Sequence, residues 1–101
     1  MNDRLLSFLG LCKRAGYLIS GADTVTKAMK EHKALLVLTA NDFSDNSLKS
    51  IEKAAVQYGV PLRMLSRNKE ALSFALGKHC GVICITDKGF ADKILTMISE
   101  E

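Results

Sequence analysis

Polar side chains that could bind a ligand gather in the stretch SGADTVTKAM, which covers residues 20–29. Ser20 stands where a helix N-cap is expected, and Asp23 follows it at the spacing of a capping acid. Val25 and two later apolar residues recur at helical spacing, so the polar side chains occupy the opposite face. We therefore expect a helix whose exposed start carries the candidate binding residues Gly21, Ala22, Asp23, Thr24 and Lys27.

Two interpretations of this helix start remain open. The first N–H groups of a helix have no partner within it and carry the positive end of the helix dipole, so they can bind anions. Lys27 lies one turn further on and could pair with a phosphate. The simpler alternative is an exposed ion pair between Asp23 and Lys27, which are four residues apart and would gain only about 0.3–0.5 kcal/mol.

A second group of reactive side chains comprises His79, Cys80 and Cys84. Two cysteines four apart on a strand would face the same side, but three ligands without a fourth make a poor structural zinc site. Cys80 beside Lys78 and His79 is the one candidate nucleophile, and no third group is present to orient it. We expect buried, unreactive cysteines, with no metal and no cofactor.

The common patterns of catalytic sites are missing from the sequence. No glycine loop has the spacing of a phosphate cradle, and no serine has glycines two positions to either side. Asp87 and Lys88 follow an apolar run, but Asp87 is well explained as an N-cap. We expect a protein that is not an enzyme.

The bulk composition fits a single compact domain over residues 1–101. The chain is 48% apolar and has a net charge of +3, a mild bias that permits an anionic partner without requiring one. Three cysteines without paired spacing favour a reducing compartment, and no apolar run approaches the roughly 18–20 residues of a membrane span. We expect a cytoplasmic protein without a membrane partner.

Helical and strand-like patterns alternate along the whole chain. Helices are expected at about Asp3–Ala15, from the Ser20 cap to about Glu31, from a Ser44 or Asp45 cap to Gly59, from the Asn68 cap to Gly77, and after Asp87; strands are expected at YLIS, Ala34–Thr39, VPLRML and Gly81–Thr86. The pattern predicts an α/β fold, a three-layer α/β/α sandwich with a small mixed sheet of about four strands. The runs Ala34–Thr39 and Gly81–Thr86 should be central, and Pro61 favours an edge strand.

Two loops beside the expected central strands add candidate binding residues. TANDFS contributes Asn41, and LGKHCG contributes Lys78, His79 and Cys80. With Lys13 and Arg14 at the end of the first helix, they would form a modest basic patch without aromatic stacking platforms. Such a patch suits a shaped, folded RNA better than a single strand.

In these same segments the sequence resembles a known family. The blocks LLSFLGLCKRAGYLISGADTVTKAM, KALLVLTANDFSDNSLKSIEKAA, YGVPL, LGKHCGVICIT and DKGFADKI resemble, in this order, the ribosomal seven-Ae/thirty-e family of kink-turn RNA-binding proteins, in its YlxQ-like bacterial branch. The resemblance covers nearly the whole chain and implies an α/β/α sandwich. It also implies RNA contacts from a glycine-started helix: Gly21 and Lys27 match the family pattern, whereas Asp23 and Thr24 stand in place of its Asn and Glu.

The resemblance and the residue pattern together lead to one functional hypothesis. The chain is interpreted as a non-catalytic RNA-binding protein of the ribosomal or translation apparatus that recognises kink-turn-like structured RNA, with the ribosome as a further partner and no DNA. The alternatives are a protein–protein adaptor on the same fold, or a relative of an RNA methyltransferase substrate-binding domain. The hypothesis requires the helix start at Gly21 to lie exposed beside the Lys78–Cys80 bend.

Overall fold

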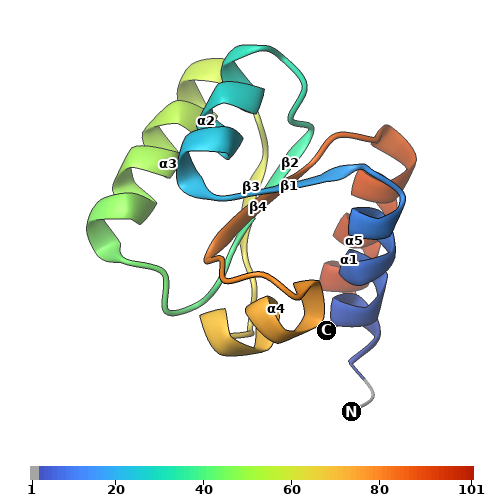
Figure 1. The fold of residues 1–101 in the computed structure, drawn as a ribbon. Helices are drawn as coiled ribbons and strands as arrows, with labels where there is room; N and C mark the ends of the chain where they lie inside the picture. Colours follow the sequence, from blue (N-terminus) through green and yellow to red (C-terminus); the bar gives the residue numbers. More distant parts are fainter. Residues whose placement is uncertain (1–2) are drawn as a thin grey trace.

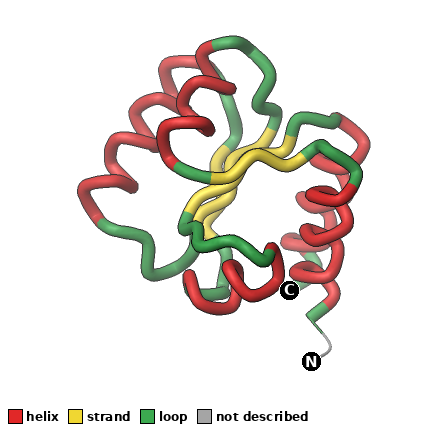
Figure 2. The backbone as a smooth tube through the Cα atoms, viewed as in Figure 1, coloured by secondary structure: helices red, strands yellow, loops and turns green. Residues whose placement is uncertain are grey.

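The computed structural model describes residues 3–101 and has a mixed sheet between two layers of helices (Figures 1 and 2). The helices are α1 (Arg4–Arg14), α2 (Ala22–Lys30), α3 (Asp45–Tyr58), α4 (Lys69–Leu76) and α5 (Lys88–Ser99). The strands are β1 (Leu18–Ser20), β2 (Leu36–Thr39), β3 (Leu62–Met64) and β4 (Val82–Ile85). The predicted three-layer α/β/α fold is therefore confirmed.

The sheet has the strand order β1-β4-β2-β3. β4 runs antiparallel to both of its neighbours, and β2 and β3 are parallel. β2 and β4 are central and entirely buried, as their continuous apolar runs predict, while β3 follows Pro61 at an edge.

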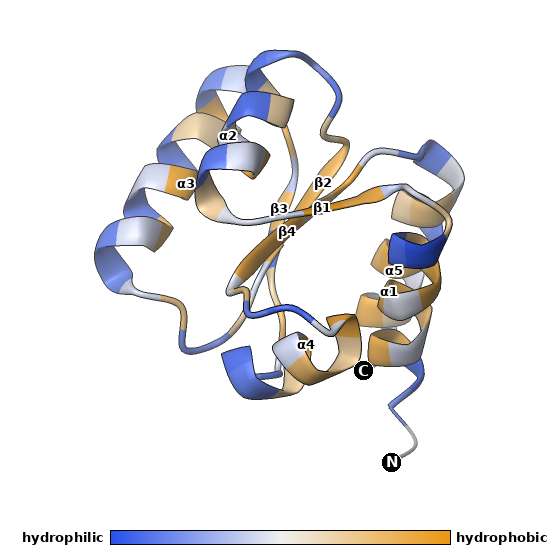
Figure 3. Cartoon of the chain, in the orientation of Figure 1, coloured by the Kyte–Doolittle hydropathy of each residue, from blue (hydrophilic) through white to orange (hydrophobic). Residues whose placement is uncertain are grey.

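Each face of the sheet packs against its own helices. One core cluster joins strand residues such as Leu38 and Ile83 to α1, α4 and α5; the other joins Val37 and Cys84 to α2 and α3. Alternate residues of β2 enter opposite clusters because successive side chains of a strand point to opposite faces. Figure 3 shows that the most hydrophobic ribbon lies in the sheet and in the parts of the helices around it.

Polar side chains define the starts of three helices. The carboxylate or amide oxygens of Asp3, Asn68 and Asp87 accept hydrogen bonds from the N–H groups of Leu6, Ala71 and Phe90, at 3.1, 2.8 and 3.0 Å. Such caps satisfy N–H groups that the helix itself leaves free. The predicted caps at Asn68 and Asp87 are confirmed.

The predicted N-cap at Ser20 is wrong. Ser20 is the last residue of β1, paired with Ile83, and the N-cap of α2 is Gly21 with a φ of 100°. A serine engaged in a strand ladder cannot also take up the position of a cap. Glycine fits the corner between β1 and α2 because it has no Cβ to oppose the positive φ.

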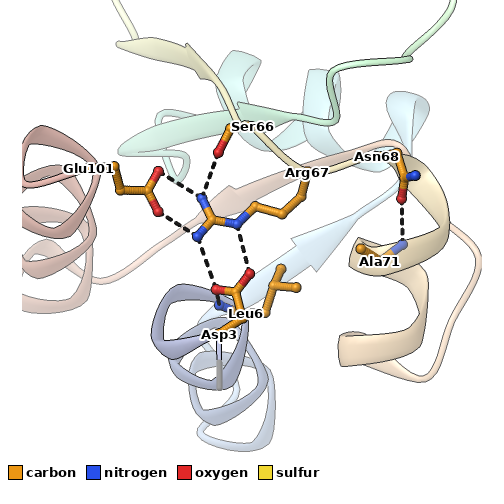
Figure 4. Close-up of polar contacts among 7 residues, drawn as sticks. All are labelled: Asp3, Leu6, Ser66, Arg67, Asn68, Ala71 and Glu101. Atoms are coloured by element: carbon orange, nitrogen blue, oxygen red, sulfur yellow. Dashed lines mark hydrogen bonds and ion pairs between the residues drawn. The ribbon is translucent and has the colours of Figure 1, made fainter. Parts of the chain in front are cut away.

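Arg67, between β3 and α4, ties together segments that are distant in the sequence (Figure 4). Its Nε and Nη2 donate to the two carboxylate oxygens of Asp3 at 2.9 and 3.0 Å, and its Nη1 donates to Glu101 at 2.7 Å. These hydrogen bonds lower the pKa values of Asp3 and Glu101 and raise that of Arg67. The start of α1, the β3–α4 connection and the end of α5 are therefore joined by one guanidinium group.

Candidate functional site

Two backbone hydrogen bonds bring three separate loops to one edge of the sheet. The Gly21 N–H donates to the Val82 carbonyl at 3.0 Å, and the Ala40 N–H donates to the Gly81 carbonyl at 2.9 Å. Because β4 is antiparallel to β1 and β2, its beginning lies beside their ends. We call this edge, made of the start of α2, residues 40–44 and residues 77–81, the candidate interface.

The start of α2 leaves backbone donors free at the candidate interface. Gly21 has no side chain to cap the helix, and the first helical bond joins the Val25 N–H to the Gly21 carbonyl at 2.9 Å. Within residues 3–101, no acceptor is bonded to the N–H groups of Ala22, Asp23 and Thr24. This helix start therefore offers hydrogen-bond donors and the positive end of its dipole to an incoming acceptor.

The side chain of Thr24 turns back onto the chain. Its hydroxyl donates to the carbonyl of Ser20 and lies 3.1 Å from that of Gly21. The hydroxyl proton is thus used to hold the β1–α2 corner, and its oxygen lone pairs remain as acceptors. Thr24 both shapes this end of the helix and stays exposed at it.

Asp23 and Lys27 are both exposed on α2. The ion pairs found among residues 3–101 do not include one between them. The alternative of an internal Asp23–Lys27 pair is therefore not what this structure contains, and the ammonium group of Lys27 remains available to an outside partner.

The loop that follows β2 is held in place by Lys69, at the start of α4, and by Arg67, one residue before the N-cap of that helix. The Asn41 N–H donates to the Arg67 carbonyl at 2.8 Å, and a carboxylate oxygen of Asp42 accepts from the Lys69 N–H at 2.7 Å. Both bonds use backbone atoms, which fixes the course of the loop. The amide side chain of Asn41 is left exposed at the candidate interface.

The loop before β4 divides into exposed and buried parts. Lys78 and His79 are exposed, whereas Cys80 is 5% exposed and packs in the core. The Cys80 N–H donates to the Ser73 hydroxyl at 3.0 Å, which anchors this loop to α4. Cys80 therefore positions Lys78 and His79, and its thiol is not part of the surface, contrary to its place among the candidate binding residues.

Cys80 and Cys84 do not belong to one site. Cys80 packs on the α1, α4 and α5 side of the sheet and Cys84 on the α2 and α3 side, so the expectation that they face one side is wrong. Cys80 lies in the loop before the strand, where strand alternation does not apply. Burial raises the pKa of Cys80, against the nearby charges of Lys13 and Lys78, and raises that of Cys84 to about 11. No metal-binding cluster occurs in the described part of the chain.

Lys13 and Arg14 lie apart from the start of α2. The Lys13 ammonium donates to the Leu76 carbonyl at the end of α4, where it meets the negative end of the helix dipole. It is thus close to the loop before β4 but engaged in a structural bond. Arg14 lines a groove between α1 and α4. Within residues 3–101, its side chain forms no hydrogen bond or ion pair with the candidate interface.

Sequence reasoning missed three residues that build the candidate interface. The ring of Phe43 and the aliphatic stem of Lys69 lie over Gly81, where a Cβ would come within 2.6 Å of Phe43 Cδ1 and 3.2 Å of Lys69 Cδ. Gly81 thus allows the loops after β2 and before β4 to pack together. No local sequence pattern predicts this contact, because the three residues come from different segments of the chain.

The fold has known relatives. The profile of the family described as "Ribosomal protein L7Ae/L30e/S12e/Gadd45 family" matches residues 3–95. Two curated relatives are each 34% identical to the chain: the "RNA-binding protein YlxQ" of Bacillus subtilis, over 89% of this chain and 90% of that protein, and the "RNA-binding protein YlxQ" of Enterococcus faecium, over 95% and 92%.

Solved structures agree with this fold. A protein of unknown function from Bacillus halodurans superimposes with a TM-score of 0.88 at 32% identity, over 95% of this chain and 97% of the other. The Giardia lamblia 15.5kD RNA binding protein has a TM-score of 0.78 at 21% identity, over 99% and 89%. At that identity, the second likeness concerns the fold alone. No helix among residues 3–101 combines the length and hydropathy needed to cross a membrane.

Proposed function

Because the chain belongs to the ribosomal protein L7Ae/L30e/S12e/Gadd45 family, we propose that it is a non-catalytic protein that binds structured RNA through the candidate interface. Its target is a bent, kink-turn-like element in ribosomal RNA or another RNA of the translation apparatus. The observation that carries the proposal is the Gly21–Val82 hydrogen bond of 3.0 Å, which holds the uncapped start of α2 against the first residue of β4, the strand that follows the Lys78–His79 loop.

Each part of the candidate interface has a role in this proposal. The free N–H groups at the start of α2 bind phosphate or carbonyl oxygens. Asp23 accepts hydrogen bonds from base amino groups, Asn41 both donates and accepts, and Lys27 pairs with a phosphate or a guanine acceptor.

The shape of the candidate interface favours a bent RNA. Strand pairing and the Gly21–Val82 bond hold the start of α2 against the beginning of β4, three residues after His79, so the α2 donors and the cations of the loop come from adjoining segments. Lys69, whose aliphatic stem lies over Gly81, adds a further cationic side chain. A folded RNA whose backbone turns sharply can meet all of these groups at once, whereas a straight duplex meets fewer of them.

A binding titration tests the proposal. A kink-turn RNA, a plain duplex with the same stem and a single strand are titrated at two salt concentrations. We expect preference for the bent RNA, and Lys27→Ala should weaken that binding and lower the salt slope by about 1, since one phosphate contact is lost. Lys93→Ala on α5, in the opposite helical layer, is the matched control and should leave both unchanged. Equal binding of the three RNAs would overturn the proposal.

A further inference from the structure

A groove on the side of the molecule formed by α1 and α4 has no role in the proposed RNA binding. It has a volume of about 710 Å³, and its apolar lining includes Leu6, Gly10, Ala71 and Ala75. Gly10 lies close to α4, since a Cβ there would be in ordinary van der Waals contact with the Ala75 carbonyl oxygen, at 3.5 Å. Figure 3 shows α4 hydrophobic at the end that lies beside α1.

The most exposed large apolar side chain of the described residues stands at the rim of this groove. Phe74 on α4 is 87% exposed, although it lines the groove that could have buried it. A phenylalanine ring that is exposed to water lacks the free-energy gain of burying its apolar surface, which is the largest stabilisation that this side chain can provide. The same face therefore carries both a protruding ring and an apolar hollow.

The charges of the groove are of both signs. Glu70 lies one turn before Phe74 on α4, and Arg14 lines the groove from α1. Neither takes part in an ion pair within residues 3–101. Carboxylates beside the ring disfavour a polyanion such as RNA, because like charges repel. A partner of mixed charge, with an apolar projection of its own, fits better.

We propose that the α1/α4 groove is the contact surface of a homodimer, in which Phe74 of each copy enters the groove of the other. A two-fold interface is self-complementary: the same patch meets itself, and a residue that projects from one copy is received by the second. The patch meets this requirement, because ring and hollow share one face and Arg14 of one copy can pair with Glu70 of the other. The α2 layer lies on the other face of the sheet, so both copies keep the start of α2 accessible (Figure 1).

Sedimentation equilibrium of the full chain tests the dimer. Between about 5 and 500 µM, a range in which modest interfaces dissociate, the average mass should rise from that of one chain towards twice that value. Phe74→Ala should weaken the association at least about tenfold, as expected for a central aromatic contact. Val56→Ala on α3 is the matched control, since Val56 is 84% exposed but lies in the other helical layer, and should change nothing.

A charge exchange gives an independent measurement. Arg14→Glu alone and Glu70→Arg alone should each weaken the dimer by placing like charges opposite one another, and the double variant should recover it. Thermal unfolding of each variant at low concentration checks that the fold is intact. A one-chain mass throughout the concentration range would overturn the proposal, and so would a dimer insensitive to Phe74→Ala. Loss of RNA binding by Phe74→Ala without any change in mass would assign the groove to RNA instead.

Discussion

The ring of Phe43 covers the backbone of Gly81 so closely that a Cβ at residue 81 would lie 2.6 Å from Phe43 Cδ1. This contact joins the loop after β2 to the loop before β4, and both loops belong to the candidate interface. The hydrogen bond from the Ala40 N–H to the Gly81 carbonyl, 2.9 Å long, holds the same two segments together.

Gly81→Ala should disturb this contact. The added methyl group forces the Phe43 ring or the Gly81 backbone to move, which should lower the free energy of unfolding by about 1–3 kcal/mol, the usual cost of overpacking. RNA affinity should fall as well, since Asn41 and Lys78 shift relative to each other. Urea unfolding and RNA titration measure the two effects.

A second substitution in the same contact tests the cause. Phe43→Ala added to Gly81→Ala removes the ring that the new methyl group meets, so the double variant should lose less stability than the sum of the two single losses. Additive losses would contradict a direct clash.

Gly21→Ala should be costly because of the backbone angles of residue 21. With φ at 100° and ψ at 142°, this residue adopts a conformation that is nearly confined to glycine, so we expect a loss of about 1–3 kcal/mol in the free energy of unfolding. RNA affinity should fall too, because strain at residue 21, between β1 and α2, would change the orientation of the start of α2.

Gly59→Ala is the matched control for this variant. Gly59 has a φ of 67° and lies at the end of α3, and an added Cβ there meets nothing within 4 Å. Alanine in this left-handed conformation costs about 1–2 kcal/mol, and RNA affinity should not change. An equal loss of RNA affinity in both variants would show that reduced stability, and not the α2 corner, is responsible.

The Asp3–Arg67 pair predicts a dependence of stability on pH. The hydrogen bonds from Arg67 lower the pKa of Asp3 in the folded state. The stabilisation is therefore complete above the unfolded pKa of about 3.9 and is lost as the pH falls through the lower, folded value.

Asp3→Asn isolates this charge, because asparagine still caps α1. At pH 7 the free energy of unfolding should fall by about 1–2 kcal/mol, with allowance for the partial exposure of the pair. The difference from the wild type should shrink below about pH 4, where the wild-type carboxyl group also becomes neutral. Denaturant unfolding across pH 2.5–7, roughly the range over which carboxyl groups titrate, measures it. A difference that stays constant with pH would contradict the role of the charge.

The three cysteines should be unreactive in the folded protein. All are buried, and burial raises each thiol pKa, that of Cys84 to about 11. At pH 8 about one Cys84 thiol in a thousand is then ionised, and only the thiolate attacks disulfide reagents. A thiol–disulfide reagent followed by absorbance should therefore react slowly with the native chain and fully after unfolding in guanidinium. Fast reaction of any thiol in the native chain would contradict this prediction.

The layers of the fold follow from local sequence patterns. The apolar runs that become β2 and β4, and the capping residues Asn68 and Asp87, act over a few residues, so they can be recognised from the sequence. The prediction of Ser20 as an N-cap is wrong because Ser20 pairs with Ile83 in the sheet. This contact between distant segments overrides the local pattern.

The candidate site is less predictable for the same reason. The sequence indicates the exposed groups at Lys27 and Lys78, but the contact of Phe43 and Lys69 with Gly81 joins three separate segments and leaves no local trace. The turning back of the Thr24 hydroxyl also depends on the strand that precedes α2.

The single strand that runs against its neighbours, β4, has a practical consequence for engineering. Its reversal lets the ends of β1, β2 and β3 and the beginning of β4 share one border of the sheet, while the opposite border carries the other connections. The exposed residues Lys78 and His79 can therefore be exchanged without touching a paired strand residue or Gly77, the left-handed C-cap of α4. Libraries built at this one connection could redirect the protein to new targets while its hydrophobic interior stays unchanged.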